Sequence, residues 1–229
     1  MAPALLHRKK APVDGTTMNA QRRPGTKPGS HDGSETDRDQ QPASLEDCRR
    51  CGLWQSATQG VPGAGPRRAP IMMVGEQPGD SEDREGKPFV GPAGRLLDNA
   101  LHEAGVAREE VFITNAVKHF KWEPRGKRRM HKTPAQREVD ACRYWLDREL
   151  AEVAPRVLVA LGSTALKALL EDTHARLQDY FGKVIEHGGR AVLATWHPSY
   201  ALRAPDPETR ERAYADIVAA LARAKKLLR

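Results

Sequence analysis

The sequence lacks the features that mark several classes of protein. No apolar run approaches the roughly 18 residues that a membrane-spanning helix needs, so we expect no membrane association. The N-terminal residues contain neither the apolar stretch nor the small-residue cleavage site of a secretory signal. The three cysteines, an odd number, argue against a disulfide framework. These absences predict a cytoplasmic protein, in which clustered cysteines bind metal or carry out redox chemistry.

Positive charge, by contrast, is plentiful and concentrated in one segment. The 229-residue chain has a net charge of +7 and an isoelectric point near 9.5, so nucleic acid or an acidic surface is the expected partner. Residues 118–132, which we call the basic segment, hold seven basic residues and one acidic residue, a net charge of +6. We expect this segment to face solvent or a polyanion, because a core would leave so many charges without partners. The isoelectric point alone would also suit a chain that binds no polyanion.

The composition divides the chain into a tail and one domain. Residues 1–43 are rich in small, polar and charged residues without a sustained apolar period, which predicts a disordered tail. Residues 44–229 alternate short apolar runs with amphipathic stretches, which predicts an α/β domain, a three-layer sandwich with a central four-stranded parallel sheet. The expected strands are residues 71–74, 111–114, 157–161 and 191–195, with 184–187 as a candidate short strand beside the sheet.

Local signals predict where helices begin and where the chain is irregular. Ser44 and Asp47 have the spacing of a helix N-terminus, and Thr133 with Pro134 would begin another helix. Residues 75–94 contain five glycines and three prolines, which predicts a long irregular loop after the first strand.

Three polar residues stand beside the expected carboxyl ends of strands. Glu76, Asn115 and His197 each lie within two residues of such an end. In an open parallel sheet these ends share one edge and one crevice, where ligands bind. We therefore expect a carboxylate, an amide and an imidazole to converge on one site.

The cysteines form part of a metal site. Cys48 and Cys51 have the spacing of half a site, and Cys142 could join them. Because the chain has no fourth cysteine, a histidine must complete the set, and His119 is the natural candidate. The alternative is that Cys142 is a core residue and His119 a solvated loop histidine.

Several motifs together resemble those of the family 4 uracil-DNA glycosylases. The matching segments are residues 75–80, 82–83, 86–94, 114–118 and 197–199. The resemblance extends over about residues 44–229 and implies a uracil-DNA glycosylase-like fold, a base-excision activity in DNA repair and a [4Fe-4S] cluster. The implied ligands are Cys48, Cys51, His119 and Cys142, with His119 where the family has its third cysteine.

Two departures from the family pattern resemble the UdgX branch. Gln77 stands where family 4 usually has alanine, and residues 127–134 lengthen the basic segment. Members of that branch excise uracil and then stay covalently attached to the abasic sugar through a histidine of this loop. The resemblance implies that His131 is the nucleophile.

The chemistry of uracil excision suggests a role for each remaining site residue. Phe89 would stack on the flipped base, and Asn115, with Gln77, would read its polar edge. His197 would donate a hydrogen bond to uracil O2 and stabilise the departing anion. Glu76 and Asp80 would stabilise the cationic sugar, and either carboxylate could assist the nucleophile. The residues expected to bind DNA are Lys127, Arg128, Arg129 and Ser199.

We therefore expect a monomeric glycosylase that acts on uracil-containing DNA, single-stranded most readily, and captures it through His131. The nearest alternative is a conventional family 4 enzyme that turns over. An alternative from another class is a non-catalytic nucleic-acid-binding protein in which the same cysteines and histidine bind zinc.

Overall fold

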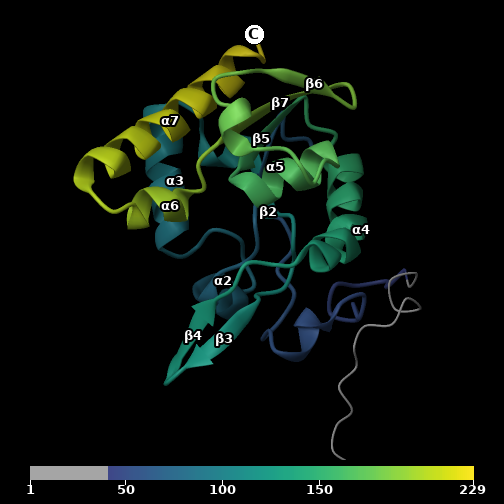
Figure 1. Ribbon diagram of the computed structural model, residues 1–229. Coiled ribbons are helices and arrows are strands. Elements are labelled where there is room, and N and C mark those ends of the chain that lie inside the picture. Colours follow the sequence, from purple (N-terminus) through teal and green to yellow (C-terminus); the bar gives the residue numbers. More distant parts are fainter. Residues whose placement is uncertain (1–40) are drawn as a thin grey trace, which may run out of the picture. The chain divides into compact units, whose positions relative to one another are not determined.

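The computed structural model describes residues 41–229, so the expected disordered tail, residues 1–43, lies outside the described residues except for its last three positions (Figure 1). The central element of the described residues is a five-stranded sheet. Across the sheet the order is β2 (Val111–Asn115), β1 (Ile71–Gly75), β5 (Val157–Leu161), β7 (Arg190–Thr195) and β6 (Ile185–His187).

The first four of these strands are parallel, which confirms the predicted α/β class. The candidate short strand at residues 184–187 is present as β6, which joins the sheet antiparallel to β7 and makes five strands in all. The two strands are joined by Gly188 and Gly189 alone, which have φ angles of 59° and 73°. A two-residue hairpin of type I′ needs positive φ at both positions, which glycine adopts without steric cost.

Helices cover both faces of the sheet (Figure 1). One layer consists of α3 (Pro92–Glu103), α6 (Pro198–Arg203) and α7 (Pro207–Lys226), and the other of α4 (Gln136–Val153) and α5 (Ser163–Leu170).

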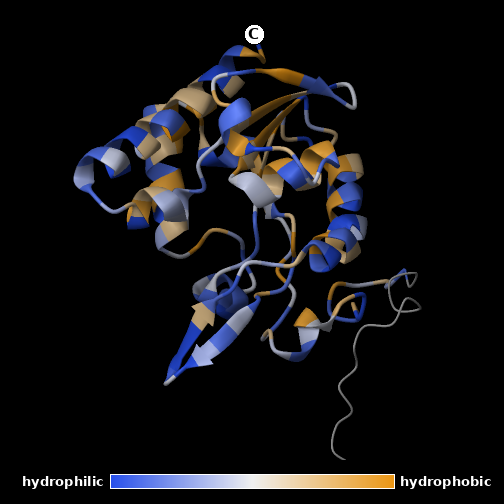
Figure 2. Ribbon diagram, viewed as in Figure 1, coloured by the Kyte–Doolittle hydropathy of each residue, from blue (hydrophilic) through white to orange (hydrophobic). Residues whose placement is uncertain are grey.

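Successive residues of a strand pack alternately against the two helix layers. Ile71 and Met73 belong to the buried cluster under α3 and α7, whereas Met72 and Val74 belong to the cluster under α4 and α5. The strands are accordingly apolar along their length, as Figure 2 shows between the helices. The three-layer sandwich is thus confirmed. No helix in residues 41–229 has both the length and the apolarity that crossing a membrane requires.

The remaining elements lie outside the sheet. They are the helix α2 (Asp80–Glu85), the strands β3 (Trp122–Arg125) and β4 (Arg128–His131), and the 3-10 helices η1 (Gly52–Gln55), η2 (Arg108–Glu110) and η3 (Leu177–Asp179).

Two of the expected helix starts were wrong. The Ser44 hydroxyl accepts a hydrogen bond from the Asp47 N–H at 3.3 Å, as a cap does, but only turns follow. Helix α4 begins at Gln136 rather than at Thr133, because the Glu138 carboxylate accepts a hydrogen bond from the Ala135 N–H at 2.7 Å and caps the helix there. The expected irregular loop after β1 also contains the helix α2.

The basic segment is partly buried, contrary to expectation. Lys118, His119 and Phe120 are 0%, 4% and 1% exposed. The Lys118 ammonium donates hydrogen bonds to the Glu149 carboxylate at 2.7 Å and to the Asn115 carbonyl at 2.8 Å. The sequence argument failed here because it assumed that no partner would be available, and Glu149 of α4 supplies one. The later residues form the exposed antiparallel hairpin of β3 and β4.

Candidate active site

A pocket of about 690 Å³ opens at the carboxyl edge of the parallel strands. Glu76 follows β1, Asn115 ends β2 and His197 follows β7, and all three line this pocket. The expected convergence of these side chains is therefore confirmed. In the sheet order, β1 lies between β2 and β5, so the pocket lies at the point where the order of strand addition reverses.

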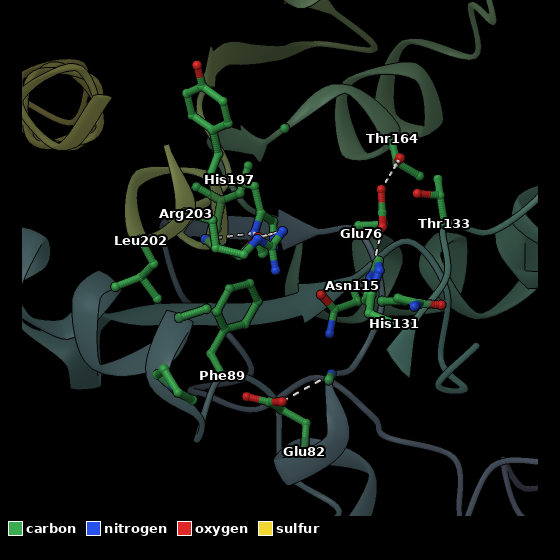
Figure 3. A pocket seen from close by; sticks show the side chains of 18 of the residues that line it. Glu76, Glu82, Phe89, Asn115, His131, Thr133, Thr164, His197, Leu202 and Arg203 are labelled. Atoms are coloured by element: carbon green, nitrogen blue, oxygen red, sulfur yellow. Dashed lines mark hydrogen bonds and ion pairs between the residues drawn. The ribbon is translucent and has the colours of Figure 1, made fainter. Parts of the chain in front are cut away.

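Other predicted site residues reach the same pocket. Those that line it are Gln77, Asp80, Phe89, Arg129, His131 and Ser199. Figure 3 shows Phe89 and His197 on one side of the pocket and Glu76 with His131 on the other. Lys127 and Arg128 do not line it; they lie at the exposed turn of the hairpin.

Glu76 links the nucleophile candidate to the sheet. Its Oε1 lies 3.2 Å from His131 Nε2, and its Oε2 accepts a hydrogen bond from the Thr164 hydroxyl at 2.6 Å (Figure 3). Burial favours the neutral carboxylic acid, but the hydrogen bonds from His131 and Thr164 outweigh it and lower the pKa of Glu76. Glu76 is therefore a carboxylate at neutral pH and the carboxylate that contacts His131.

His197 is held as a neutral imidazole with a defined tautomer. Burial lowers its pKa to about 4, and the nearby His131 and Arg203 act in the same direction, against Glu76. Its Nδ1 accepts a hydrogen bond from the Ser199 N–H at 3.1 Å and lies 2.8 Å from the Ser199 hydroxyl. Because Nδ1 accepts, the ring proton is on Nε2, which is free to donate. Ser199, expected to bind DNA, thus orients His197 in this structure.

Phe89 and Asn115 lie close together because Gly75 has no side chain. A Cβ at position 75 would lie 2.6 Å from Phe89 Cζ and 2.4 Å from Asn115 Oδ1. Phe89 itself has a φ of 55°, the left-handed region that costs a bulky residue energy and often marks functional sites. Asn115 Oδ1 is buried and has no hydrogen-bond partner among the described residues. A ligand donor would satisfy it.

Gln77 fastens the hairpin to the sheet edge. Its amide nitrogen donates to the carbonyls of Lys121 at 3.1 Å and Lys132 at 3.2 Å, and its oxygen accepts from the Lys121 N–H at 3.0 Å. Since Lys121 and Lys132 flank the two strands, this one side chain holds both ends of the hairpin. The expected contact of Gln77 with uracil stays a prediction.

Arg129 holds the hairpin to α2. Its guanidinium contacts Asp80 Oδ1 at 2.5 Å and Asp83 Oδ2 at 2.6 Å, and it lies over the rings of Phe120 and Trp122. In this structure the side chains of Asp80 and Arg129 are therefore paired with each other. The expected roles of Asp80 at the sugar and of Arg129 in DNA binding stay predictions.

Sequence reasoning missed four supporting residues. Thr164 orients Glu76, Asp83 holds Arg129, Glu149 pairs with Lys118, and the Glu82 carboxylate accepts hydrogen bonds from the N–H groups of two loop glycines. Thr164 lies three residues beyond the end of β5, just outside the limit of two residues that selected Glu76, so a slightly wider limit would have found it. The partner of Lys118 could not, because Glu149 is distant in sequence.

The three cysteines and His119 gather away from the pocket. The Cys142 thiol accepts a hydrogen bond from the Lys118 N–H at 3.2 Å, and the Cys48 thiol accepts one from the Trp145 indole at 3.2 Å. Burial raises the pKa of Cys142 to about 12, with smaller effects from nearby Cys51 and Cys48. Such thiols become thiolates only when a cation compensates their charge.

His119, the fourth ligand implied by the resemblance, is buried next to Lys118, whose N–H contacts Cys142. Its Nδ1 is buried without a hydrogen-bond partner among the described residues, and burial lowers its pKa to about 4, so the imidazole is neutral. Within residues 41–229 no three or more His, Cys, Asp or Glu side chains are arranged to share a single metal ion. A [4Fe-4S] cluster takes one protein ligand on each iron, so its donors need not converge on one point.

Comparison with known proteins places this fold and pocket in one family. Residues 62–222 match the Uracil DNA glycosylase superfamily, and the chain belongs to it. Its relatives include Type-4 uracil-DNA glycosylases. The protein of Thermotoga maritima is 38% identical over 183 residues, which cover 80% of this chain and 92% of that protein. The protein of Pyrobaculum aerophilum is 40% identical over 170 residues (70% and 82%), and that of Sulfurisphaera tokodaii 37% over 171 residues (69% and 73%).

Proposed function

We propose that this protein excises uracil from DNA and then remains covalently bound to the abasic sugar through His131. Family membership supports the excision. The observation that carries the covalent step is the contact of 3.2 Å between His131 Nε2 and Glu76 Oε1 at the pocket. It brings together a nucleophile and a carboxylate that is ionised at neutral pH.

Uracil enters the pocket as a flipped base. Phe89 stacks on the ring, and Asn115 reads its edge. The unpartnered Oδ1 of Asn115 accepts the N3–H of uracil, and its amide nitrogen donates to O4. Cytosine presents the opposite pattern at both atoms, so it leaves the buried amide unsatisfied and is rejected.

Bond cleavage is assisted from both sides of the glycosidic bond. As the bond between uracil N1 and sugar C1′ breaks, uracil takes the electron pair, and the Nε2–H of neutral His197 donates to O2 of the resulting anion. The Glu76 carboxylate stabilises the developing positive charge on the sugar. Uracil N1 then takes a proton from solvent.

Capture follows at the same carboxylate. Glu76 accepts the proton from His131 Nε2, and the freed lone pair of Nε2 forms the bond to C1′. The products are an abasic sugar attached to His131, a protonated Glu76 and free uracil. In the conventional alternative a water molecule takes the place of His131, and the DNA is released.

We also propose that Cys48, Cys51, His119 and Cys142 hold a [4Fe-4S] cluster. Three observations support this assignment. The residue types suit a cluster, two N–H groups donate to cysteine sulfurs, and the buried His119 Nδ1 has no hydrogen-bond partner among the described residues. The cluster would act as a structural clamp between the chain before η1, the start of the basic segment and α4. A purified protein that is brown and absorbs near roughly 400 nm fits this proposal, whereas a colourless zinc protein does not.

Single-stranded DNA is the proposed preferred substrate, because an unpaired base costs less to flip. The exposed hairpin turn supplies charge for the phosphates: Arg125, Lys127 and Arg128 have no ion-pair partner among residues 41–229. A monomeric state and a cytoplasmic location stay predictions from the sequence.

A denaturing gel tests the covalent step. Wild-type protein incubated with a uracil-containing oligonucleotide should give a shifted band that survives SDS and heat. His131→Ala should abolish the band while uracil release persists. His174→Ala removes an exposed histidine remote from the pocket and should leave both unchanged. Free abasic DNA without a shifted band from the wild type would support the conventional enzyme instead.

A further inference from the structure

Three aromatic rings form a column that ends at the rim of the pocket. The centroids of Phe181 and Trp196 are 4.7 Å apart, and those of Trp196 and Tyr200 are 4.5 Å apart with an interplanar angle of 23°. The Trp196 indole donates a hydrogen bond to Asp216 Oδ2 at 3.0 Å, which fixes the middle ring. Tyr200 is thus the outer ring of a column that is already ordered.

The outer ring is exposed although it adjoins the pocket. Trp196 and Tyr200 both line the pocket; Trp196 directly precedes His197, and Tyr200 follows it by three residues. Tyr200 is 37% exposed, and because Trp196 covers one face, the exposed surface includes the other. The Tyr200 hydroxyl makes no hydrogen bond within residues 41–229. Tyr200 therefore exposes its aromatic ring to solvent, and no hydrogen bond of its hydroxyl to the described residues holds the ring in place.

Two of the large exposed apolar side chains, Tyr200 and Leu202, line the pocket. In the part of the chain that the structure describes, the large ones are Met130, Tyr200 and Leu202. Met130 precedes His131, whereas Tyr200 and Leu202 lie on α6, which begins directly after His197. Because Tyr200 and Leu202 line the pocket, they lie where a DNA strand would deliver its uracil. Figure 3 places Leu202 and Arg203 of α6 beside Phe89 at this side of the pocket.

We propose that Tyr200 is a stacking platform for an unpaired nucleobase next to the flipped uracil. This subsite rests on the proposed function and extends it from the target base to its neighbour in single-stranded DNA. Every base has a flat face, so stacking on an aromatic ring tolerates any sequence. The column holds Tyr200 in place before DNA arrives, which lowers the entropic cost of binding. Arg203 on the same helix adds positive charge for the adjoining phosphate.

The test compares binding with and without the neighbouring base. The target position carries deoxypseudouridine, whose carbon–carbon glycosidic bond resists cleavage, so only binding is measured. Three single-stranded oligonucleotides are used: one intact, one with a tetrahydrofuran abasic site 5′ of the target, and one with it 3′. Fluorescence anisotropy gives the Kd of full-length wild type, Tyr200→Ala and Tyr200→Phe for each.

The proposed subsite predicts a specific pattern of Kd values. Wild type and Tyr200→Phe should bind one of the two abasic-flanked oligonucleotides about tenfold more weakly than the intact one. Tyr200→Ala should bind the intact oligonucleotide about tenfold more weakly and should lose nothing further on that same abasic-flanked one. This pattern would show that the Tyr200 ring and the neighbouring base interact directly.

Two results would overturn the subsite. One is wild-type affinity of Tyr200→Ala for the intact oligonucleotide. The other is an equal loss on all three oligonucleotides, which a purely structural role of Tyr200 in packing against Trp196 would produce. Thermal unfolding checks that each variant is folded. Uracil release from an ordinary uracil oligonucleotide is measured separately, so a failure of the proposed catalysis is distinguishable from a failure of the subsite.

Discussion

The pocket is built from two regions that hold their side chains in different ways. At the sheet edge, Glu76, Asn115 and His197 are positioned by strand ends, and Thr164 and Ser199 orient the side chains of Glu76 and His197. At the hairpin of β3 and β4, His131 is 40% exposed and is held through side-chain contacts made by Gln77 and Arg129. In the proposed function the sheet edge carries the groups for excision, the hairpin carries the nucleophile for capture, and Glu76 takes part in both steps. Damage to the hairpin should therefore spare excision.

The largest expected effect concerns the buried pair behind the sheet edge. Lys118→Met leaves Glu149 without its partner and removes the hydrogen bond to the Asn115 carbonyl, so we expect a loss of about 3–5 kcal/mol in the free energy of unfolding. Urea denaturation measures it. The double variant Lys118→Met/Glu149→Leu should recover much of the loss, because no buried charge remains unpaired. Equal losses in the single and double variants would contradict this account.

A smaller effect is expected from crowding the sheet edge. Gly75→Ala places a methyl group against Phe89 and Asn115, which must both move, so we expect uracil release to fall about 100-fold. Single-turnover release kinetics on a uracil oligonucleotide measure it. Gly52→Ala is the matched control, because no atom lies within 4 Å of its added Cβ. Release at the wild-type rate from Gly75→Ala would show that neither side chain matters for excision.

Loosening the hairpin should separate capture from excision. Arg129→Met breaks the contacts with Asp80 and Asp83, so we expect covalent adduct formation to slow about 10- to 30-fold while uracil release changes little. Both yields are read from the same quenched time course. Lys132→Met, which breaks only the exposed pair with Glu123, should change neither rate. Equal slowing of both steps in Arg129→Met would mean that the two regions are not separable.

The smallest effect is on the pH dependence of stability. The pKa of His197 is about 4 in the folded protein against an ordinary value of 6.5, so the unfolded chain binds the extra proton between these values. Above pH 6.5 His197 is neutral in both the folded and the unfolded protein, so its burial costs no protonation energy. As the pH falls from 6.5 towards 4, the unfolded chain takes up the proton first, and the free energy of unfolding decreases. His197→Gln should lessen the fall between pH 6.5 and 5.5 by about 1 kcal/mol, measured by urea unfolding. An unchanged slope would contradict the lowered pKa, and His174→Gln is the exposed control.

The residues that could be predicted share one property. Glu76, Asn115 and His197 follow strands whose apolar runs are visible in the sequence, and parallel strand ends meet at one edge whatever the loops do. The edge strand β6 was harder to predict, because only three residues and a Gly-Gly turn mark it. The roles of the site residues in catalysis and binding remain predictions that the experiments above test.

The error in the basic segment has a definite cause. Lys118 was expected in solvent, because its charge was considered without a partner. In the structure Lys118 meets Glu149, 31 residues away, and Arg129 meets Asp80, 49 residues away. Local sequence carries the charge of a side chain but not the identity of the group that will neutralise it.

The sequence by itself determined the α/β class, the edge at which the pocket forms and the concentration of positive charge in one segment. These follow from periodicity and composition, which are local properties of the chain. Only the tertiary structure decided that Glu76 is the carboxylate on His131 and that Ser199 sets the tautomer of His197. It also decided that four of the seven basic residues in the basic segment form ion pairs. Those outcomes depend on distances between residues remote in sequence, and packing alone sets such distances.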